Sequence, residues 1–385
     1  MKKKRYCIFA AQYFPHMGGV ERYTYNLAKE LLKRGNEVVI VTSNVYKLES
    51  VETIDGITIY RFPCFNLLDG RYPILKLGKE LRSLDSKLKS ERFDLVIVNT
   101  RFYFHSLYGM RFAYKKKIPC ITLEHGTSHL SVHNKCWDKI GEVFEHCLTQ
   151  IDKIYCKNYY GVSKACNEWL RHFGIDAKGV LYNSIDVDEI SEIEKHIVPV
   201  YRKQYKIPSD GIVIAFTGRL LKEKGLHSLL NVMEKVHQKY DKVFLFIAGD
   251  GDMEEEINTR KKEYIIPLGR LNFEEIVTLL NETDIFCLPS FSEGFSTSIL
   301  EAAVCGCFII TTARGGAKEL LLSEEYGCII PNNKEEILFS ALESVLSDEK
   351  RRKKGIELTF ERIEKHFTWI NVANQVERIC EEMKN

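Results

Sequence analysis

The sequence has no long apolar run, no closely paired cysteines and no dinucleotide fingerprint. Its apolar stretches fall short of the roughly 18 consecutive residues that a membrane-spanning helix needs. The 12 cysteines are scattered without a Cys-x-x-Cys pair, which favours free thiols in a reducing compartment. The glycine turn Gly18-Gly19 does not follow the Gly-x-Gly-x-x-Gly pattern. These absences argue against an integral membrane protein, a disulfide framework and a dinucleotide-binding motif, and they favour a cytoplasmic protein.

Charge is nearly balanced over the whole chain but not along it. Residues 1–195 hold 30 Lys and Arg against 23 Asp and Glu, whereas residues 196–385 hold 25 against 30. A basic front half suggests contact with an anionic surface. The segment 75–89 reads as a basic helix with interleaved leucines, which fits either an ordinary solvated helix or a peripheral contact with the inner face of a membrane. No motif for nucleic acid accompanies it.

Apolar runs alternate with amphipathic segments in two series. The first series begins with a strand at 6–11 and a helix at 20–34, and the second begins with a strand at 212–217. A chain of 385 residues is also too long for one core. The pattern predicts an α/β protein with two doubly wound, Rossmann-like domains.

A strand, a loop of small residues and a helix N-terminus follow one another within residues 284–306. The apolar run 284–289 predicts a buried strand that ends at a proline. The N–H groups and the positive dipole end of the following helix favour a phosphate. Glu293 lies in the loop and Glu301 in the first turns of the helix, where carboxylates suit hydroxyl groups. Together these groups predict a site for a sugar nucleotide.

Two cations follow the strand predicted at 212–217. Arg219 offers a planar fork of donors and Lys224 a point charge, five residues further on. Either residue alone is usually an ordinary surface cation. Because Gly218 and Gly249 also end neighbouring strands, these residues predict an anion clamp at the sheet edge that carries the two glutamates.

In the first series, Gly18-Gly19 follows the strand at 6–11 and His125 follows the strand at 118–123. A glycine pair fits a tight turn as well as a close approach of the backbone to a ligand, and both interpretations stay open. A lone histidine is more often structural, but ligands of α/β proteins bind at the carboxyl ends of strands. A structural and a functional role for His125 are therefore equally supported.

In their order along the chain, these motifs resemble those of the family 4 retaining glycosyltransferases, which have the GT-B fold. The matching segments are Gly18-Gly19-Val20-Glu21-Arg22, the loop at His125, Asn183-Ser184-Ile185-Asp186, Gly218-Arg219 with Lys224-Gly225, Gly249-Asp250-Gly251 and Glu293-x7-Glu301. The resemblance implies two Rossmann-like domains that face each other across a cleft, with an acceptor-binding domain at 1–190 and a donor-binding domain at 191–366. It also implies that the C-terminal helix, 367–385, crosses back to the first domain.

The resemblance further implies a role for each matching residue. Arg219 and Lys224 would bind the donor diphosphate and stabilise its leaving charge, and Glu293 would bind hydroxyls of the donor sugar. Glu301 would bind the ribose, and His125 would lie near the transferred sugar. The other donor-binding residues would be Gly18, Gly19, Gly218, Gly249, Arg270, Phe295, Ser296 and Thr297.

The implied reaction moves a hexose or N-acetylhexosamine from a nucleotide sugar to a glycan or lipid-linked acceptor, as in surface polysaccharide assembly. A UDP-sugar is favoured as donor, and GDP-mannose is the alternative. Because two cations can neutralise the leaving diphosphate, we expect no metal cofactor. Two other functions stay open: a nucleotide-sugar epimerase of GT-B-like fold, and a non-catalytic protein that binds nucleotide sugars.

Overall fold

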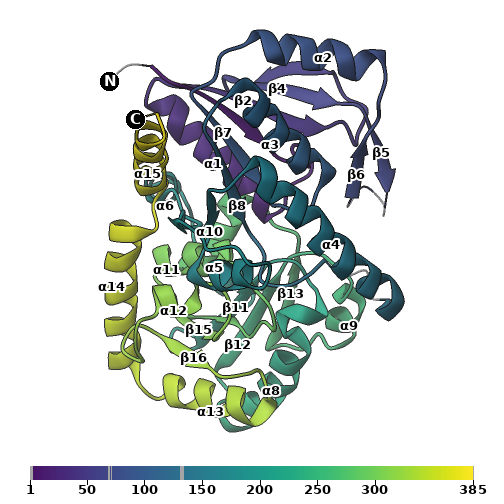
Figure 1. Cartoon of the computed structure of the whole chain (residues 1–385). Coiled ribbons are helices and arrows are strands. Elements are labelled where there is room, and N and C mark those ends of the chain that lie inside the picture. The colour runs from purple at the N-terminus through teal and green to yellow at the C-terminus, as the bar shows by residue number, and fades with distance from the viewer. Residues whose placement is uncertain (1–2, 68–69, 71, 131–133, 385) are drawn as a thin grey trace. The chain divides into compact units, whose positions relative to one another are not determined.

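The computed structural model describes residues 3–67, 70, 72–130 and 134–384 (Figure 1). The chain forms two compact units, which we call unit 1 and unit 2. Unit 1 comprises Met1–Asn183 and Trp369–Asn385, and unit 2 comprises Ser184–Thr368. The first division lies after residue 183 instead of the expected 190, and the second lies after residue 368 instead of 366.

Unit 1 is built on an eight-stranded sheet in the order β10-β9-β8-β7-β1-β2-β4-β3. Its strands are β1 (Arg5–Phe9), β2 (Glu37–Ser43), β3 (Val51–Ile54), β4 (Ile57–Phe62), β7 (Leu95–Asn99), β8 (Cys120–Glu124), β9 (Tyr159–Gly161) and β10 (Gly179–Val180). All neighbouring strands are parallel except β3 and β4, which form a hairpin at Asp55-Gly56. A separate hairpin joins β5 (Cys64–Leu67) to β6 (Tyr72–Leu75).

Helices cover both faces of the unit 1 sheet because its strands are apolar on both sides. In β1, Tyr6 and Ile8 join one apolar core and Cys7 and Phe9 join the other. The helices of unit 1 are α1 (Gly19–Lys33), α2 (Lys79–Ser90), α3 (Phe104–Lys116), α4 (Lys135–Tyr155), α5 (Lys164–Arg171) and α15 (Trp369–Glu382). Helices α1 and α15 supply the first core, and α2 and α3 supply the second.

Helix α15 is the last element of the chain and packs beside α1, the first helix (Figure 1). Trp369 is buried at its start, with its ring 5.0 Å from that of Tyr23 in α1. Arg34, just past the end of α1, forms an ion pair of 3.0 Å with Glu377. The end of the chain therefore belongs to the core of unit 1.

Unit 2 has a six-stranded sheet in the order β13-β12-β11-β14-β15-β16, and all of its neighbouring strands are parallel. The strands are β11 (Ile212–Thr217), β12 (Val243–Ala248), β13 (Ile265–Gly269), β14 (Ile285–Leu288), β15 (Phe308–Thr312) and β16 (Cys328–Ile330). The helices are α6 (Val187–Glu194), α7 (Tyr201–Gln204), the 3-10 turn η1 (Lys222–Lys224), α8 (Leu226–Lys239), α9 (Glu254–Thr259), α10 (Phe273–Asn281), α11 (Thr297–Val304), α12 (Ala317–Leu320), α13 (Glu335–Leu346) and α14 (Glu349–His366).

Each sheet has a point where the strand order reverses. In unit 1 the chain proceeds outward from β1 in one direction and from β7 in the other, so the reversal lies between β1 and β7. In unit 2 it lies between β11 and β14 for the same reason. Open α/β sheets bind ligands outside the carboxyl ends of the strands at this switch point. The fold thus directs attention to the loops that follow β1, β7, β11 and β14.

The expectation of one helix over 75–89 is wrong at its start. Leu75 ends strand β6, and α2 begins at Lys79 after Gly78. The leucines of α2, Leu81, Leu84 and Leu88, are buried in the second core of unit 1. Its basic residues, among them Arg82, face solvent. The leucine stripe is therefore an ordinary core contact. Within the described ranges, no helix combines the length and apolar character needed to cross a bilayer.

Candidate functional site

The loop after β11 in unit 2 is shaped by a glycine that the fold requires. Gly225 has φ = +75°, and a Cβ atom there would lie 2.1 Å from the Pro289 carbonyl oxygen at the end of β14. A second link is the hydrogen bond of 2.8 Å from Phe291 N to Glu223 O. The loops after β11 and β14 therefore touch at the switch point, and Lys224 lies directly before Gly225.

Lys224 and Glu293 form an ion pair across this switch point. Lys224 Nζ lies 2.7 Å from Glu293 Oε1, and Ser290 Oγ donates to the same oxygen at 2.7 Å. The Lys224 side chain is 24% exposed and that of Glu293 10% exposed. The structure thus brings together two of the predicted residues, 69 positions apart in sequence, and adds Ser290, which the sequence did not single out.

Glycines at the ends of β11 and β12 let two backbone segments approach closely. Gly218 has φ = +142° and Gly249 has φ = +145°. A Cβ atom on Gly249 would lie 1.8 Å from the Gly218 carbonyl oxygen, so no other residue fits there without a shift. Gly249 N donates to Gly269 O at 2.7 Å, which continues the edge to β13. A structural need accounts for Gly249 whether or not it contacts a ligand.

The two arginines predicted for this site differ in their surroundings. Arg219 is exposed, and no carboxylate of the described residues pairs with it. Arg270, beyond β13, is also exposed, and its guanidinium lies 3.4 Å from Asp250. Exposed pairs of this kind contribute little to stability. Arg219 therefore has its charge available next to Gly218, whereas the side chain of Arg270 has a surface partner.

Helix α11 begins with backbone N–H groups that no described side chain caps. Ser296 is its N-cap residue, and Ser296 Oγ hydrogen-bonds Ser298 Oγ at 2.9 Å. Phe295 anchors the loop, because it is 6% exposed and its ring lies 5.2 Å from that of Phe367. Thr297 opens the helix, and Glu301, one turn later, is 4% exposed. The amides at this helix start suit an anion.

Two buried polar atoms near these loops lack a hydrogen-bond partner among the described residues. They are Thr217 Oγ1, at the end of β11, and Asn333 Nδ2, which lies 3.0 Å from where a Cβ on Gly225 would be. Such atoms are costly unless something else satisfies them. Asn333 follows β16 far along the chain, so no local pattern could have linked it to this loop.

The glycine pair of unit 1 lies at the start of α1. Gly18 N donates to Glu21 Oε2 at 2.8 Å, and a Cβ on Gly18 would lie 2.7 Å from that oxygen. A Cβ on Gly19, in contrast, would meet no atom within 4 Å. Gly18 thus has a structural reason to be glycine, whereas the fold gives none for Gly19. The open space at Gly19 favours the ligand-approach interpretation for that residue.

His125 follows β8 and is held by neighbours from β7 and α1. Its Nε2 lies 2.9 Å from Asn99 Oδ1, and its ring packs edge-on against Tyr23 at 5.0 Å. Burial lowers the pKa of His125 to about 3. The imidazole is therefore neutral at physiological pH, and it can serve as a hydrogen-bonding group but not as a cation.

Metal-ligating side chains gather elsewhere. The sequence contains two Asp-x-Asp triplets, at 186–188 and 250–252. Asp186 accepts a hydrogen bond from Glu189 N and caps α6, and Asp250 lies beside Arg270. Within the part of the chain that the structure describes, the group of residues close enough to hold an ion consists of three histidines in unit 1, and neither triplet belongs to it.

Two Rossmann-like units, each with polar groups and glycines at its switch point, define the GT-B class of glycosyltransferases. Two family models match the chain: "Glycosyltransferase Family 4" over residues 17–189 and "Glycosyl transferases group 1" over residues 198–362. The chain therefore belongs to the group 1 glycosyltransferases of family 4, as the sequence motifs suggested.

Named relatives agree with this assignment. An uncharacterized glycosyltransferase of Methanocaldococcus jannaschii is 25% identical over 100% of both chains. The phosphatidylinositol N-acetylglucosaminyltransferase GPI3 subunit of Saccharomyces cerevisiae is 27% identical over 81% of this chain and 68% of its own. Among solved structures, HepE of Anabaena in complex with UDP-glucose has a TM-score of 0.73 at 17% identity and covers 98% of this chain, with 100% of its own matched. The protein is a glycosyltransferase with a GT-B fold.

Proposed function

We propose that this glycosyltransferase moves an N-acetylhexosamine or hexose from a UDP-sugar to a lipid-linked acceptor, with retention at the anomeric carbon. The observation that carries this proposal is the Lys224–Glu293 ion pair at the switch point of unit 2. It lies in the same series of strand-end loops as Arg219 and the start of α11, so cations, amides and a carboxylate converge where α/β sheets bind ligands.

In the proposed reaction, the donor diphosphate takes Lys224 as a partner in place of Glu293. The exchange is favourable because a diphosphate carries more negative charge than a carboxylate, and Arg219 supplies a second cation. Glu293 is then released toward the sugar hydroxyls. Its carboxylate is held at the same time by Ser290, whose hydroxyl lies 2.7 Å away.

The chemical step breaks the bond between the anomeric carbon and the diphosphate oxygen. Arg219, Lys224 and the α11 amides meet the charge that develops on the diphosphate, the kind of electrostatic stabilisation that dominates such reactions. The acceptor hydroxyl bonds to the anomeric carbon on the face that the diphosphate leaves. Its proton passes to a phosphate oxygen, so no metal is required in this scheme.

Support for the donor and acceptor comes from the relatives' names. The yeast relative is named for the transfer of N-acetylglucosamine to phosphatidylinositol, and a subunit of the same name from Homo sapiens is 24% identical over 97% of this chain. HepE was solved with UDP-glucose. We therefore place UDP-N-acetylglucosamine first and UDP-glucose second as donors.

A lipid acceptor also fits an exposed apolar face in unit 1. Helix α4 leaves Trp137, Ile140 and Ile154 58–65% exposed, and exposed apolar side chains on one helix suit a membrane interface. Lys139, 76% exposed, lies on the same helix. We propose that α4, together with the basic face of α2, contacts an anionic membrane surface.

A donor screen tests the proposed function. Purified protein would be incubated with UDP-N-acetylglucosamine, UDP-glucose or GDP-mannose, with and without a phosphatidylinositol acceptor in detergent micelles. We expect release of UDP that depends on the acceptor. A new epimer without any acceptor would support the epimerase instead, and donor binding with no turnover on any acceptor would support the non-catalytic protein.

Sedimentation with vesicles tests the membrane contact separately. The protein should pellet with vesicles that contain anionic phosphatidylglycerol and much less with pure phosphatidylcholine. The double variant Trp137→Glu/Ile140→Glu should stay in the supernatant, whereas Leu322→Glu, at an exposed apolar residue of unit 2, should pellet like the parent protein. Equal behaviour of both variants would remove α4 from the proposal.

A further inference from the structure

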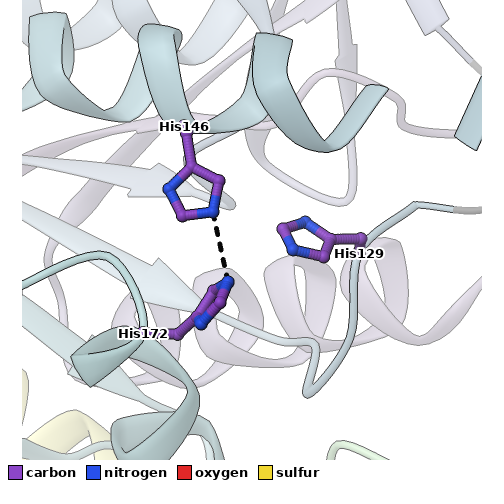
Figure 2. A group of neighbouring side chains, drawn as sticks. All are labelled: His129, His146 and His172. Carbon is purple, nitrogen blue, oxygen red and sulfur yellow. Dashed lines mark hydrogen bonds between the residues drawn. The ribbon is translucent and has the colours of Figure 1, made fainter. Parts of the chain in front are cut away.

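Three histidines of unit 1 converge at its surface (Figure 2). His146 projects from α4, His172 directly follows α5, and His129 comes from the loop after β8. One ring nitrogen from each lies within 4.8 Å of the others, and His146 Nε2 lies 3.1 Å from His172 Nε2. Figure 2 shows the three rings around one common space. We call them the histidine cluster.

The histidine cluster borders an open pocket of about 350 Å³. Its other lining residues are Lys139, Glu142, Val143 and Trp169. The indole of Trp169 stacks on the His172 ring, with the ring centres 5.0 Å apart and an angle of 10° between the planes. His129 and His146 are partly buried and His172 is exposed. An ion can therefore reach the three rings from solvent.

The spacing of the rings suits a tetrahedral ion. Bonds of about 2.0–2.1 Å to imidazole nitrogens at tetrahedral angles place two ligand atoms about 3.3–3.4 Å apart. The 3.1 Å between His146 and His172 is close to this separation. The third nitrogen needs only a small side-chain movement to join them.

One histidine is already oriented by a carboxylate. His129 Nδ1 lies 2.6 Å from Glu145 Oε2, and the other Glu145 oxygen accepts from buried Arg101 at 2.6 Å. Metal-bound histidines commonly donate their second nitrogen to a carboxylate in this way, which fixes the ring and its tautomer. With Nδ1 engaged, His129 offers Nε2 to the cluster.

Packing alone accounts less well for the arrangement. A hydrogen bond between two neutral imidazoles explains the His146–His172 contact, but it does not explain why a third, carboxylate-oriented imidazole converges on the same space. Burial, followed by the charges of His172 and His129, lowers the pKa of His146. The neutral imidazole is the form that binds a metal.

We propose that His129, His146 and His172 bind one divalent transition-metal ion, with Zn²⁺ as the preferred ion and solvent in the fourth position. Three imidazoles select borderline ions such as Zn²⁺ over Mg²⁺ or Ca²⁺, which prefer oxygen ligands. The site lies in unit 1, whereas the proposed diphosphate clamp belongs to unit 2. The ion is therefore a structural element and takes no part in the transfer step.

The metal would fix a loop that carries His125. Glu124 Oε1 accepts hydrogen bonds of 3.1 Å from both His125 N and Gly126 N at the start of the loop, and His129 lies near its end. Buried Arg101 joins the two ends, because it pairs with Glu124 at 3.0 Å and with Glu145 at 2.6 Å. An ion on His129 thus restrains the loop. Any effect on turnover rests on the proposed function, but the binding of metal does not.

Metal titration tests the site directly. Untagged, full-length protein would be stripped with EDTA, dialysed and titrated with Zn²⁺ against a chromophoric chelator. We expect one tightly bound ion per chain. His172→Ala, at an exposed position, should weaken binding by at least about 100-fold, beyond the range for loss of an outer-sphere partner. His196→Ala, in unit 2 and 77% exposed, is the matched control and should bind normally.

Two spectroscopic readouts complete the test. Co²⁺ in place of Zn²⁺ should give the intense visible absorption of a four-coordinate site. Cu²⁺ should quench the fluorescence of Trp169 in the parent protein but not in His172→Ala, with Trp169→Phe identifying the responding residue. Circular dichroism of each variant confirms folding, and His146→Ala provides an independent loss of ligand. Substoichiometric binding by the parent protein, or equal affinity in His172→Ala and His196→Ala, would overturn the proposal.

Discussion

The switch points of the two units have the same topology but different chemistry. In unit 2 the loops after β11 and β14 carry charge, with Lys224 paired to Glu293 and Arg219 exposed nearby. In unit 1 the corresponding region carries His125, whose lowered pKa keeps it neutral, and Asn99, 1% exposed. The same fold thus provides one edge for an anion and one edge for neutral hydrogen bonding.

The difference shows how a shared architecture divides two substrates of unlike character. A nucleoside diphosphate needs cations and amides, whereas a neutral sugar or acceptor hydroxyl needs neutral donors and acceptors. The comparison makes definite predictions, because changes at the charged edge should alter catalysis and changes at the neutral edge should alter positioning or stability.

The largest expected effect comes from removing the cation at the charged edge. Lys224→Ala should lower kcat by about 10²–10³-fold, the cost of losing one group that stabilises developing charge, or about 2.7–4 kcal/mol. Steady-state UDP release measures it. Lys222→Ala, in the same 3-10 turn and exposed, is the control and should change kcat less than about twofold. Equal losses in both variants would contradict a specific role for Lys224.

A pair of glycines separates structure from function across the two units. Gly249→Ala should destabilise the protein by about 3 kcal/mol, because it combines a strained φ with a close contact. Gly19→Ala should leave the free energy of unfolding within about 0.5–1 kcal/mol while lowering activity, because its Cβ meets no protein atom. Urea denaturation and the transferase assay together measure both. Full activity of Gly19→Ala would return this glycine to a simple turn.

Glu301→Gln tests the buried carboxylate of α11. A hydrogen bond to a charged group contributes about 1.5–3 kcal/mol, so the dissociation constant for UDP should rise by about tenfold or more. Isothermal titration calorimetry with UDP alone measures this, since the proposed contact is to the ribose. Glu336→Gln, on the exposed side of α13, is the control. Unchanged affinity in Glu301→Gln would remove the residue from the donor site.

Acid should weaken unit 1 through its buried neutral histidines. Burial lowers the pKa of His105 to about 4 and that of His125 to about 3. The unfolded chain binds protons below pH about 6.5 that the folded unit does not, so stability falls as pH drops from 6.5 toward 4. For His105 alone the loss at pH 5 is about 2 kcal/mol. All three tryptophans, Trp137, Trp169 and Trp369, lie in unit 1, so their fluorescence during urea denaturation reports on it.

A His105→Asn variant sharpens the acid test. Asparagine can still donate to Val41 O, which His105 Nε2 now contacts at 2.9 Å, but it does not titrate. Its unfolding free energy should depend less steeply on pH between 7 and 5 than that of the parent protein. Identical slopes would mean that other groups cause the acid sensitivity.

The smallest expected effect is that of EDTA on the transfer step. If Arg219 and Lys224 stabilise the leaving diphosphate, turnover with saturating donor should be unchanged by EDTA in the His172→Ala variant, which lacks the proposed zinc site. A decrease confined to the parent protein would point to the histidine cluster. Loss of activity in both, restored by Mg²⁺, would contradict a metal-independent reaction.

Much of the fold could be predicted because parallel strands buried on both faces appear as continuous apolar runs. The strands at 212–217, 243–248 and 308–312 were placed at their observed bounds. The start of α2 was misplaced because the leucine pattern continues into β6 with only Gly78 to separate them. Local periodicity does not show where a helix gives way to a short hairpin.

The candidate site could be predicted only in part. Glycines and charges at strand ends were visible in the sequence, but the ion pair joins residues 69 positions apart and depends on the order of strands. Ser290 and Asn333 carry no motif. The histidine cluster was invisible because positions 129, 146 and 172 follow no metal-binding spacing and meet only after α4 and α5 have packed.

The place of α15 has a consequence for how the protein is made. Unit 1 contains both Met1–Asn183 and Trp369–Asn385, so unit 2 is inserted within its sequence. Val372, Val376 and Trp369 are each no more than 3% exposed in the core that α1 and β1 also form. On the ribosome, the first 183 residues therefore wait with an open apolar face while the whole of unit 2 is synthesised. Unit 2, although second in sequence, is the first that can fold to completion.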